Sequence, residues 1–305
     1  MRIVVALGGN ALLPRGQHPD AEPQALRVTE AARALAPLAR DHELVITHGN
    51  GPQVGLLAME SAADPALAHP YPIDVLGAET QGMIGYWLIQ GLHNALPGRQ
   101  VACLLNQTVV SANDPAFHSP TKFVGPVWTE SEARRQAAER GWAIARDGEH
   151  WRRVVASPEP RRVAEAGLIR LLLDAGAVTV CAGGGGIPVV EHADGQLTGT
   201  EAVVDKDLTA ALLAEEVKAD FLLILTDVPH VVAGYGTPKA RPLHTTTPRE
   251  LRSLAFPPGS MGPKVEAAAR FVEHTGAMAA IGPLSDVHGI LQSTTGTYVR
   301  PDRPI

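Results

Sequence analysis

The sequence predicts an α/β fold in which an open, mostly parallel sheet lies between two layers of helices, as a three-layer αβα sandwich with a small protruding subdomain. Three observations support this. Short apolar runs are each followed by a glycine-rich or polar turn, helix-like stretches lie between the runs, and one proline-rich segment interrupts the alternation. Strands that are apolar throughout are typical of a sheet covered on both faces. Alternating strands and helices predict parallel βαβ units.

Four predicted strands form the centre of the sheet, at residues 2–7, 44–47, 177–181 and 221–225. Each is followed directly by a turn: Gly8-Gly9-Asn10, His48-Gly49-Asn50-Gly51, Gly183 to Gly186, and Thr226-Asp227. Helices are expected at 23–41, 52–62, 74–95, 162–175, 205–217 and 263–274. Ligands bind at the carboxyl ends of strands in open parallel sheets. We therefore expect the four turns to lie at one edge and to form the site.

The segment 113–157 differs from its surroundings. It contains Pro115, Pro120 and Pro126, three tryptophans including Trp142 and Trp151, and the turn Asp147-Gly148. These features indicate an excursion made of a hairpin and a helix, which would protrude from the sandwich as a lid or small subdomain. A second hairpin is expected at 188–198, turning at Ala193-Asp194-Gly195.

Composition excludes several classes of protein. The chain has 305 residues, 45% hydrophobic residues and a net charge of −6, which suits a folded core and disfavours a nucleic-acid-binding surface. Two cysteines are too few for a disulfide framework. No run approaches the roughly 18 apolar residues of a membrane helix, and the start of the chain does not resemble a signal peptide. We expect a cytoplasmic, soluble protein with no membrane or nucleic-acid partner.

The common cofactor motifs are missing from the sequence. No stretch matches the P-loop pattern G-x-x-x-x-G-K-[S/T], and the G-x-G-x-x-G fingerprint fails because Pro188 stands where its last glycine would be. No His/Cys cluster has the spacing of a zinc site. The glycine-rich turns are therefore the remaining candidates for a ligand-binding site.

Glycine-rich turns combined with isolated lysines indicate anion chemistry. Glycine lets backbone N–H groups approach an anion closely, and a helix that starts at such a turn adds its dipole. Only five of the 26 basic residues are lysines, and Lys122, Lys206 and Lys264 lie in turn motifs. A compact ammonium suits sites that a planar guanidinium does not. The plainer alternatives are chance, surface lysines, and helix capping by the acids beside Lys206.

Seven stretches of the sequence carry a family resemblance. They are Ala6 to Leu12, Thr47 to Gly55, Gln81 to Tyr86, Asn113 to Phe117, Ala182 to Pro188, Asp205-Lys206-Asp207, and Gly259 to Glu266. Through them the chain resembles the carbamate kinases of the amino acid kinase superfamily nearly from end to end. His48-Gly49-Asn50-Gly51-Pro52-Gln53 and Gly259-Ser260-Met261-Gly262-Pro263-Lys264 favour this branch over other kinases of the superfamily.

The resemblance implies a reversible phosphoryl transfer, ATP + carbamate = ADP + carbamoyl phosphate, run towards ATP in arginine or purine-derivative catabolism. It implies a single amino acid kinase-like domain over 1–305. The acceptor lobe would cover about 1–200, including a protruding subdomain at about 113–157, and the nucleotide lobe about 201–305. The family is typically homodimeric, and Mg²⁺ would be carried by the phosphates of ATP or ADP.

The residues suit this reaction. Carbamate is already an anion, so catalysis consists of positioning and of neutralising charge on the transferring group. The candidate catalytic residues are Lys122, Lys206 and Lys264, with Asp207 as the organiser that holds lysines in place. The acceptor and the transferring phosphoryl would be bound by Gly8, Gly9, Asn10, Gly49, Asn50 and Gly51. The nucleotide pocket would be lined by Thr226, Asp227, Tyr235, Met261, Gly262 and Pro263, with Lys206 and Lys264.

The sequence departs from the family pattern in three places. Phe123-Val124 follow Lys122 where relatives often carry proline and isoleucine, residues 14–24 look less familiar, and Ile281-Gly282-Pro283-Leu284 replaces a threonine-bearing turn. Two other functions stay open on the residues alone. One is a kinase of the same family with another small acceptor, and the other is a nucleotide-sensing protein that has lost turnover. The apolar helix at 74–95 is either subunit core or a dimer interface.

Overall fold

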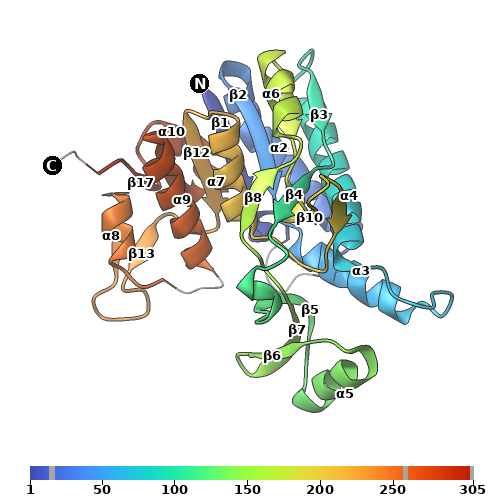
Figure 1. Cartoon of the computed structure of the whole chain (residues 1–305). Coiled ribbons are helices and arrows are strands. Elements are labelled where there is room, and N and C mark those ends of the chain that lie inside the picture. Colours follow the sequence, from blue (N-terminus) through green and yellow to red (C-terminus); the bar gives the residue numbers. More distant parts are fainter. Residues whose placement is uncertain (14–17, 257–259, 303–305) are drawn as a thin grey trace.

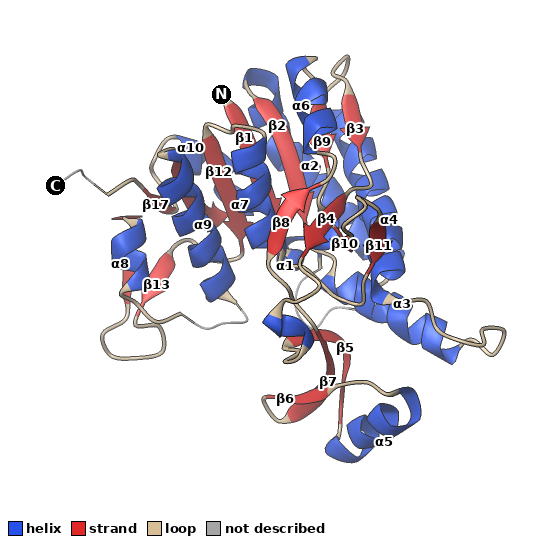
Figure 2. Cartoon of the chain, in the orientation of Figure 1, coloured by secondary structure: helices blue, strands red, loops and turns tan. Residues whose placement is uncertain are grey.

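The computed structural model describes residues 1–13, 18–256 and 260–302. Its central sheet has eight strands in the order β15-β17-β16-β12-β1-β2-β9-β3. All neighbours are parallel except β16 and β17. The mostly parallel sheet is thus confirmed (Figure 2). In sheet order the strands are β15 (Thr245–Thr246), β17 (Thr297–Val299), β16 (Met278–Pro283), β12 (Phe221–Thr226), β1 (Arg2–Leu7), β2 (Glu43–His48), β9 (Val178–Val180) and β3 (Val101–Cys103).

Helices cover both faces of this sheet, because the side chains of each strand alternate between two cores. In β1, Ile3 and Val5 belong to the core under the helices α2 (Ala21–Asp41), α4 (Ile73–Ala95) and α10 (Val287–Leu291). Val4 and Ala6 belong to the core under α6 (Ala166–Asp174), α7 (Lys206–Glu216) and α9 (Met261–Thr275). The αβα layers predicted from the sequence are confirmed (Figure 1). Outside the excursion, the structure also describes the helices α1 (Gly9–Leu12), α3 (Gly51–Ala63) and α8 (Pro248–Arg252).

A smaller sheet, β11-β10-β4-β8, lies beside the sandwich. Its strands are β4 (Gln107–Val110), β8 (Pro160–Val163), β10 (Ile187–Glu191) and β11 (Leu197–Gly199). The antiparallel pair β10–β11 confirms the hairpin expected at 188–198. A further antiparallel pair joins β13 (Val231–Ala233) and β14 (Arg241–Leu243).

The segment 113–157 protrudes from the body, as Figure 1 shows. It contains the 3-10 helix η1 (Pro115–Phe117), the helix α5 (Glu130–Arg140) and the antiparallel sheet β5-β7-β6. Thr129 and Glu132 form a capping box that starts α5, and Gly141, at φ 70°, ends it. The sheet strands are β5 (Lys122–Trp128), β6 (Ile144–Asp147) and β7 (His150–Val155).

The excursion touches the body through two glycines. A Cβ on Gly55 of α3 would lie 2.7 Å from the backbone nitrogen of Gly125 in β5. Real Cβ contacts are not this short, so the backbones meet here only because Gly55 has no side chain. This contact brings the first half of β5, with Lys122, close to the body.

One predicted element is wrong at its start. The helix expected at 162–175 begins at Ala166, and Arg162 and Val163 belong instead to β8, which pairs antiparallel with β4. Local periodicity continues through this stretch, but the backbone follows a partner strand more than 50 positions away. In the described ranges, no helix is long and apolar enough to cross a membrane.

Candidate active site

The four predicted turns meet at one edge of the sheet. They follow β12, β1, β2 and β9, which are consecutive in the sheet and parallel. Backbone hydrogen bonds link the turns across the edge. The N–H of Gly8 donates to the carbonyl of Leu225 at 3.0 Å, and that of Gly49 donates to the carbonyl of Leu7 at 3.1 Å. Segments more than 200 positions apart in the sequence are thereby adjacent.

Gly49 makes the closest approach between two of these turns. A Cβ there would lie 3.0 Å from the nitrogen of Gly9 and 3.4 Å from Cδ of Lys206. The absence of a side chain therefore lets the first turn, the second turn and the lysine at the start of α7 share one space. Gly51 begins α3, and Asn50, which is buried, donates from Nδ2 to the hydroxyl of Thr80 at 2.8 Å.

The run Gly183 to Gly186 packs against His48 and Asn50 of the second turn. Ala182, Gly184, Gly185 and Gly186 have φ of 51°, 65°, 92° and 87°, a conformation that favours glycine. A Cβ on Gly184 would overlap the side chain of Asn50. The hydroxyls of Thr108 and Thr209 both donate to the carbonyl of Gly185, at 2.8 and 2.9 Å. The tetraglycine turn is thus a tightly packed, buried part of the site.

Two buried amides hold the same turn. Gln81 donates from Nε2 to the carbonyl of Gly183 at 3.1 Å and accepts from the N–H of Asn106 at 3.0 Å. Oδ1 of Asn106 accepts from the N–H of Ala182 at 2.5 Å. Sequence reasoning quoted Gln81 in a motif without giving it a role, and it missed Asn106, which no local pattern distinguishes.

Asp207 joins two lysines from different helices. Its Oδ1 accepts from Nζ of Lys206 at 2.5 Å, and its Oδ2 accepts from Nζ of Lys264 at 3.0 Å. The Asp207 side chain is buried, and about one seventh of each lysine side chain is exposed. Both ammonium groups are therefore fixed by one carboxylate, as predicted for the organiser, and each keeps donors available for a ligand.

The two lysines favour the ionised form of Asp207. Burial pushes the pKa of Asp207 upward, but Lys206 and Lys264 outweigh it and lower that pKa to about 2. The pKa of Lys206 is lowered, mainly because the ammonium group is buried. The carboxylate of Asp207 raises this pKa, and the positive charge of Lys264 lowers it further. Two cations share one anion, so the cluster has an excess positive charge that a phosphate or carboxylate would balance.

Lys122 reaches the site from the excursion but contacts a different acid. Its Nζ donates to Oδ2 of Asp205 at 2.8 Å. Oδ1 of Asp205 accepts from the N–H groups of Asp207 and Leu208 at 2.9 and 3.3 Å, which caps α7. Sequence reasoning considered capping by these acids, but gave no partner to Asp205 because the lysine lies 83 positions away.

His48 lies at the bottom of the site as a neutral group. Burial lowers its pKa to about 4, and nearby Lys206 acts in the same direction. Its Nδ1 lies 3.1 Å from the carbonyl of Gly49, to which the Nδ1–H donates. A Cβ on Gly183 would overlap the imidazole ring. His48 thus connects the second turn with the tetraglycine turn.

The proposed nucleotide residues lie on the C-terminal side. Thr226 is buried at the end of β12, and its hydroxyl lies 3.2 Å from Oδ1 of Asp227. Tyr235 is 77% exposed, between β13 and β14. Met261, Gly262 and Pro263 form the first turn of α9, half-buried. The side chain of Asn10, and Gly259 of the quoted motif, lie outside what the structure describes.

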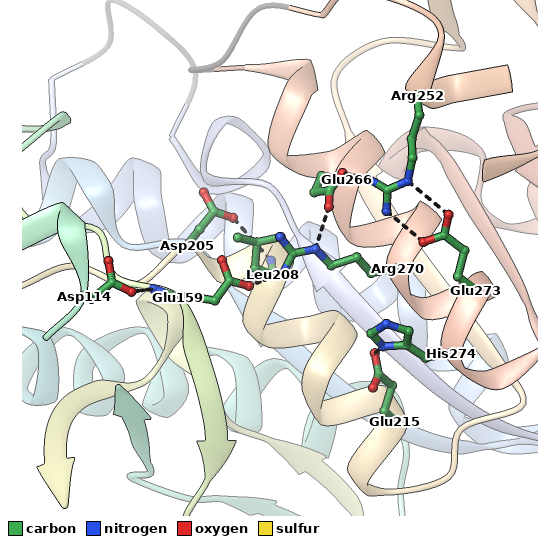
Figure 3. Close-up of polar contacts among 10 residues, drawn as sticks. All are labelled: Asp114, Glu159, Asp205, Leu208, Glu215, Arg252, Glu266, Arg270, Glu273 and His274. Atoms are coloured by element: carbon green, nitrogen blue, oxygen red, sulfur yellow. Dashed lines mark hydrogen bonds and ion pairs between the residues drawn. The ribbon is translucent and has the colours of Figure 1, made fainter. Parts of the chain in front are cut away.

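An ion-pair network holds α9, the helix that carries Lys264 (Figure 3). Arg270 donates from Nε to Glu266 at 2.6 Å and forms a second ion pair with Glu159. The N–H of Glu159 in turn donates to Oδ2 of Asp114 at 3.0 Å. Asp114 lies at the start of the excursion and Glu159 lies just after its end, so Arg270 ties its base to α9.

The chain is similar to known proteins over nearly its full length. The model of the amino acid kinase family matches residues 1–282. A carbamate kinase of Rhizobium meliloti (strain 1021) is 52% identical over 303 residues, covering 98% of this chain and 93% of the relative. A carbamate kinase of Haemophilus influenzae is 49% identical over 300 residues, covering 98% and 96%. The structure of a carbamate kinase from Giardia lamblia bound to AMP-PNP superposes with a TM-score of 0.91 at 37% identity, covering 99% of this chain and 98% of that one.

Proposed function

Because the chain belongs to the carbamate kinases of the amino acid kinase family, we propose that it transfers a phosphoryl group reversibly between ATP and carbamate. The observation that carries the proposal is the buried cluster Lys206–Asp207–Lys264 beside Gly9 and Gly49. This cluster holds two ammonium groups where the carboxyl ends of four parallel strands meet. That is the arrangement needed to bring two anions together.

In the direction of ATP synthesis, a β-phosphate oxygen of ADP attacks the phosphorus of carbamoyl phosphate. The bond between that phosphorus and the carbamate oxygen breaks, and carbamate leaves as an anion. No proton needs to move in this step, which agrees with a site whose histidine is neutral and buried. Lys206 and Lys264 would neutralise charge on the transferring group and on the nucleotide phosphates, while Asp207 holds both in position.

The two substrates would approach from opposite lobes. We place carbamate or carbamoyl phosphate in the acceptor lobe, about 1–200, against Gly8, Gly9, Gly49, Asn50 and Gly51, with Lys122 of the excursion closing that side and excluding water. Asn10 belongs to the same proposed set. The nucleotide would bind in the lobe at about 201–305. The relative from Giardia lamblia bound to AMP-PNP, an imido analogue of ATP, supports a nucleotide ligand for this fold.

Mg²⁺ is proposed to arrive as the complex of the nucleotide phosphates and so as part of the substrate. Both oxygens of Asp207 accept from ammonium groups, and Asp205 accepts from Lys122 and from backbone N–H groups. These carboxylates are engaged as lysine partners, so the phosphates would supply the oxygen ligands that Mg²⁺ prefers.

We further propose that the protein works in the cytoplasm and pairs as a homodimer through α4. Val75 and Tyr86 of this helix are 38% and 54% exposed. Ile84 and Leu88 on its other side are buried in the core. The helix therefore serves the subunit core on one face and presents apolar surface on another.

One assay tests the proposed function. Purified protein is mixed with ADP, Mg²⁺ and carbamoyl phosphate, and ATP is measured by luciferase. Acetyl phosphate and isopentenyl diphosphate in place of carbamoyl phosphate serve as controls for acceptor identity. ATP formation that depends on carbamoyl phosphate is expected. ATP formation with only another donor would assign a different acceptor, and nucleotide binding with no ATP from any donor would contradict an enzyme.

A further inference from the structure

Asp205 makes two different connections with its two carboxylate oxygens. Oδ1 caps α7 by accepting from the N–H groups of Asp207 and Leu208; the bond to Leu208 is drawn in Figure 3. Oδ2 accepts from Nζ of Lys122 at 2.8 Å. The Asp205 side chain is 13% exposed and that of Lys122 is 37% exposed. A single carboxylate thus links the first turn of α7 to the excursion.

The backbone places these two residues opposite each other. Lys122 is paired with Val155 at the end of β7. The next residue, Ala156, forms a parallel bridge with Ala202, and its carbonyl accepts from the N–H of Val203 at 3.0 Å. The segments that carry Lys122 and Asp205 are therefore both paired with the same short piece of chain, Val155-Ala156, so backbone hydrogen bonds bring the two side chains together.

We propose that Asp205 is a positioning residue that sets where the ammonium group of Lys122 stands relative to Lys206. Since Asp205 caps the helix whose first residue is Lys206, it fixes the start of that helix with one oxygen and the approach of Lys122 with the other. A substrate anion between the two lysines would meet both cations at a separation that this carboxylate determines. The inference rests on the proposed function, because it assigns a substrate contact to Lys122.

A double-mutant cycle tests the proposal by ATP formation from ADP and carbamoyl phosphate. Asp205→Asn keeps an oxygen that can cap α7 but puts an amide where Lys122 needs an acceptor. We expect kcat to fall about tenfold or more, the order of magnitude for a hydrogen bond to a charged group, or KM for carbamoyl phosphate to rise by a similar factor. KM for ADP should stay within about twofold. In the Lys122→Ala background, Asp205→Asn should have little further effect, because its partner is already missing.

Other outcomes would overturn the proposal. Full activity of the Asp205→Asn variant would contradict it. If Asp205→Asn lowers ATP formation by the same factor in the wild type and in the Lys122→Ala variant, Asp205 acts only through α7. Thermal unfolding distinguishes a role in positioning Lys122 from a role in capping α7. Both Asp205→Asn and Asp205→Ser should still unfold in one cooperative transition. If neither variant shows a cooperative transition, Asp205 serves the fold alone. Asp194→Asn is the matched control, since Oδ1 of Asp194 accepts from the N–H of Gln196 at 3.0 Å in the exposed hairpin turn.

The wild-type enzyme separates this inference from the proposed function. If the wild type makes no ATP from carbamoyl phosphate, the proposed function fails before any variant is compared. If the wild type is active and the Asp205→Asn variant equals it, only the positioning role fails.

Discussion

Nζ of Lys264 donates to Oδ2 of Asp207 at 3.0 Å, although the two residues lie 57 positions apart on different helices. This bond joins the first turn of α9 to the first turn of α7, where Lys206 occupies the other oxygen of the same carboxylate. The helix starts, each carrying a lysine, are thereby fixed relative to one another.

Lys206→Ala and Lys264→Ala should each lower turnover about a hundredfold or more. Removing one preorganised electrostatic donor typically costs about 2.7–4 kcal/mol of barrier. The measurement is steady-state ATP formation. Lys218→Asn is the control, because Lys218 is exposed at the end of α7 and has φ 57°, which asparagine tolerates. A Lys206 or Lys264 variant with over half of wild-type turnover would contradict the role of that lysine.

Asp207→Asn should lower turnover while the protein still unfolds in one cooperative transition. Asparagine is neutral and offers one acceptor oxygen, so both ammonium groups lose their anion and only one of them keeps a hydrogen-bond acceptor. Kinetics and thermal unfolding are measured on the same preparation. If the cooperative transition disappears, Asp207 serves the fold and not the reaction.

At alkaline pH, kcat/KM should begin to fall at a lower pH than the pKa of an ordinary lysine. Burial lowers the pKa of Lys206, so the ammonium is lost at lower pH than in an exposed lysine, and kcat/KM should fall as pH rises through that point. Lys206→Arg, which stays protonated, should remove this decline in whatever activity remains. An unchanged decline in the arginine variant would assign the titration to another group.

Tyr86→Glu should convert the proposed dimer to monomers, as measured by light scattering. Tyr86 is exposed on α4, so the new charge would be buried only in a dimer. Trp87, an obvious choice from the sequence, is less suitable because it packs partly against the subunit core. Leu171→Glu on α6 is the matched control, as Leu171 is 66% exposed on the other side of the sheet. A dimer that survives Tyr86→Glu would place the interface elsewhere.

Gly184→Ala should destabilise the fold and lower activity together. The residue has φ 65°, and its Cβ would overlap Asn50. The left-handed backbone alone costs about 1–2 kcal/mol in a residue other than glycine. Gly195→Ala, at φ 82° with open space around its Cβ, has the backbone cost without the overlap. Equal losses of stability in the two variants, measured by urea unfolding, would show that the contact with Asn50 is unimportant.

The centre of the fold was predictable because its signals are local. Continuous apolar strands followed by glycine-rich or polar turns identify β1, β2, β9 and β12, and parallel strands must place those turns at one edge. The start of α6 was not predictable, because Arg162 and Val163 form a strand only through their pairing with β4. Local periodicity does not contain that information.

The site was predictable to the extent that its residues stand in motifs. Asp205-Lys206-Asp207 is recognisable as three neighbouring charges at a helix start. Lys264 is recognisable because it follows a glycine-proline turn. The assignment of Lys122 to Asp205, and not to Asp207, could not come from the sequence, because β7 decides which residues face each other. Asn106 was missed for a similar reason: its side chain accepts from the backbone of a distant turn, and its backbone bonds to Gln81 and Ile187.

The excursion leaves the body after β4 and returns just before β8, and these two strands are hydrogen-bonded neighbours. The hydrogen bonds between β4 and β8 therefore hold the two ends of the insertion together. A short connector would be enough to join these two strands. A change in the length of this segment would therefore leave the strand pairing of the sandwich intact. If Lys122 contacts the acceptor as proposed, this contact belongs to an inserted segment, whereas the residues proposed for the nucleotide belong to the sandwich itself.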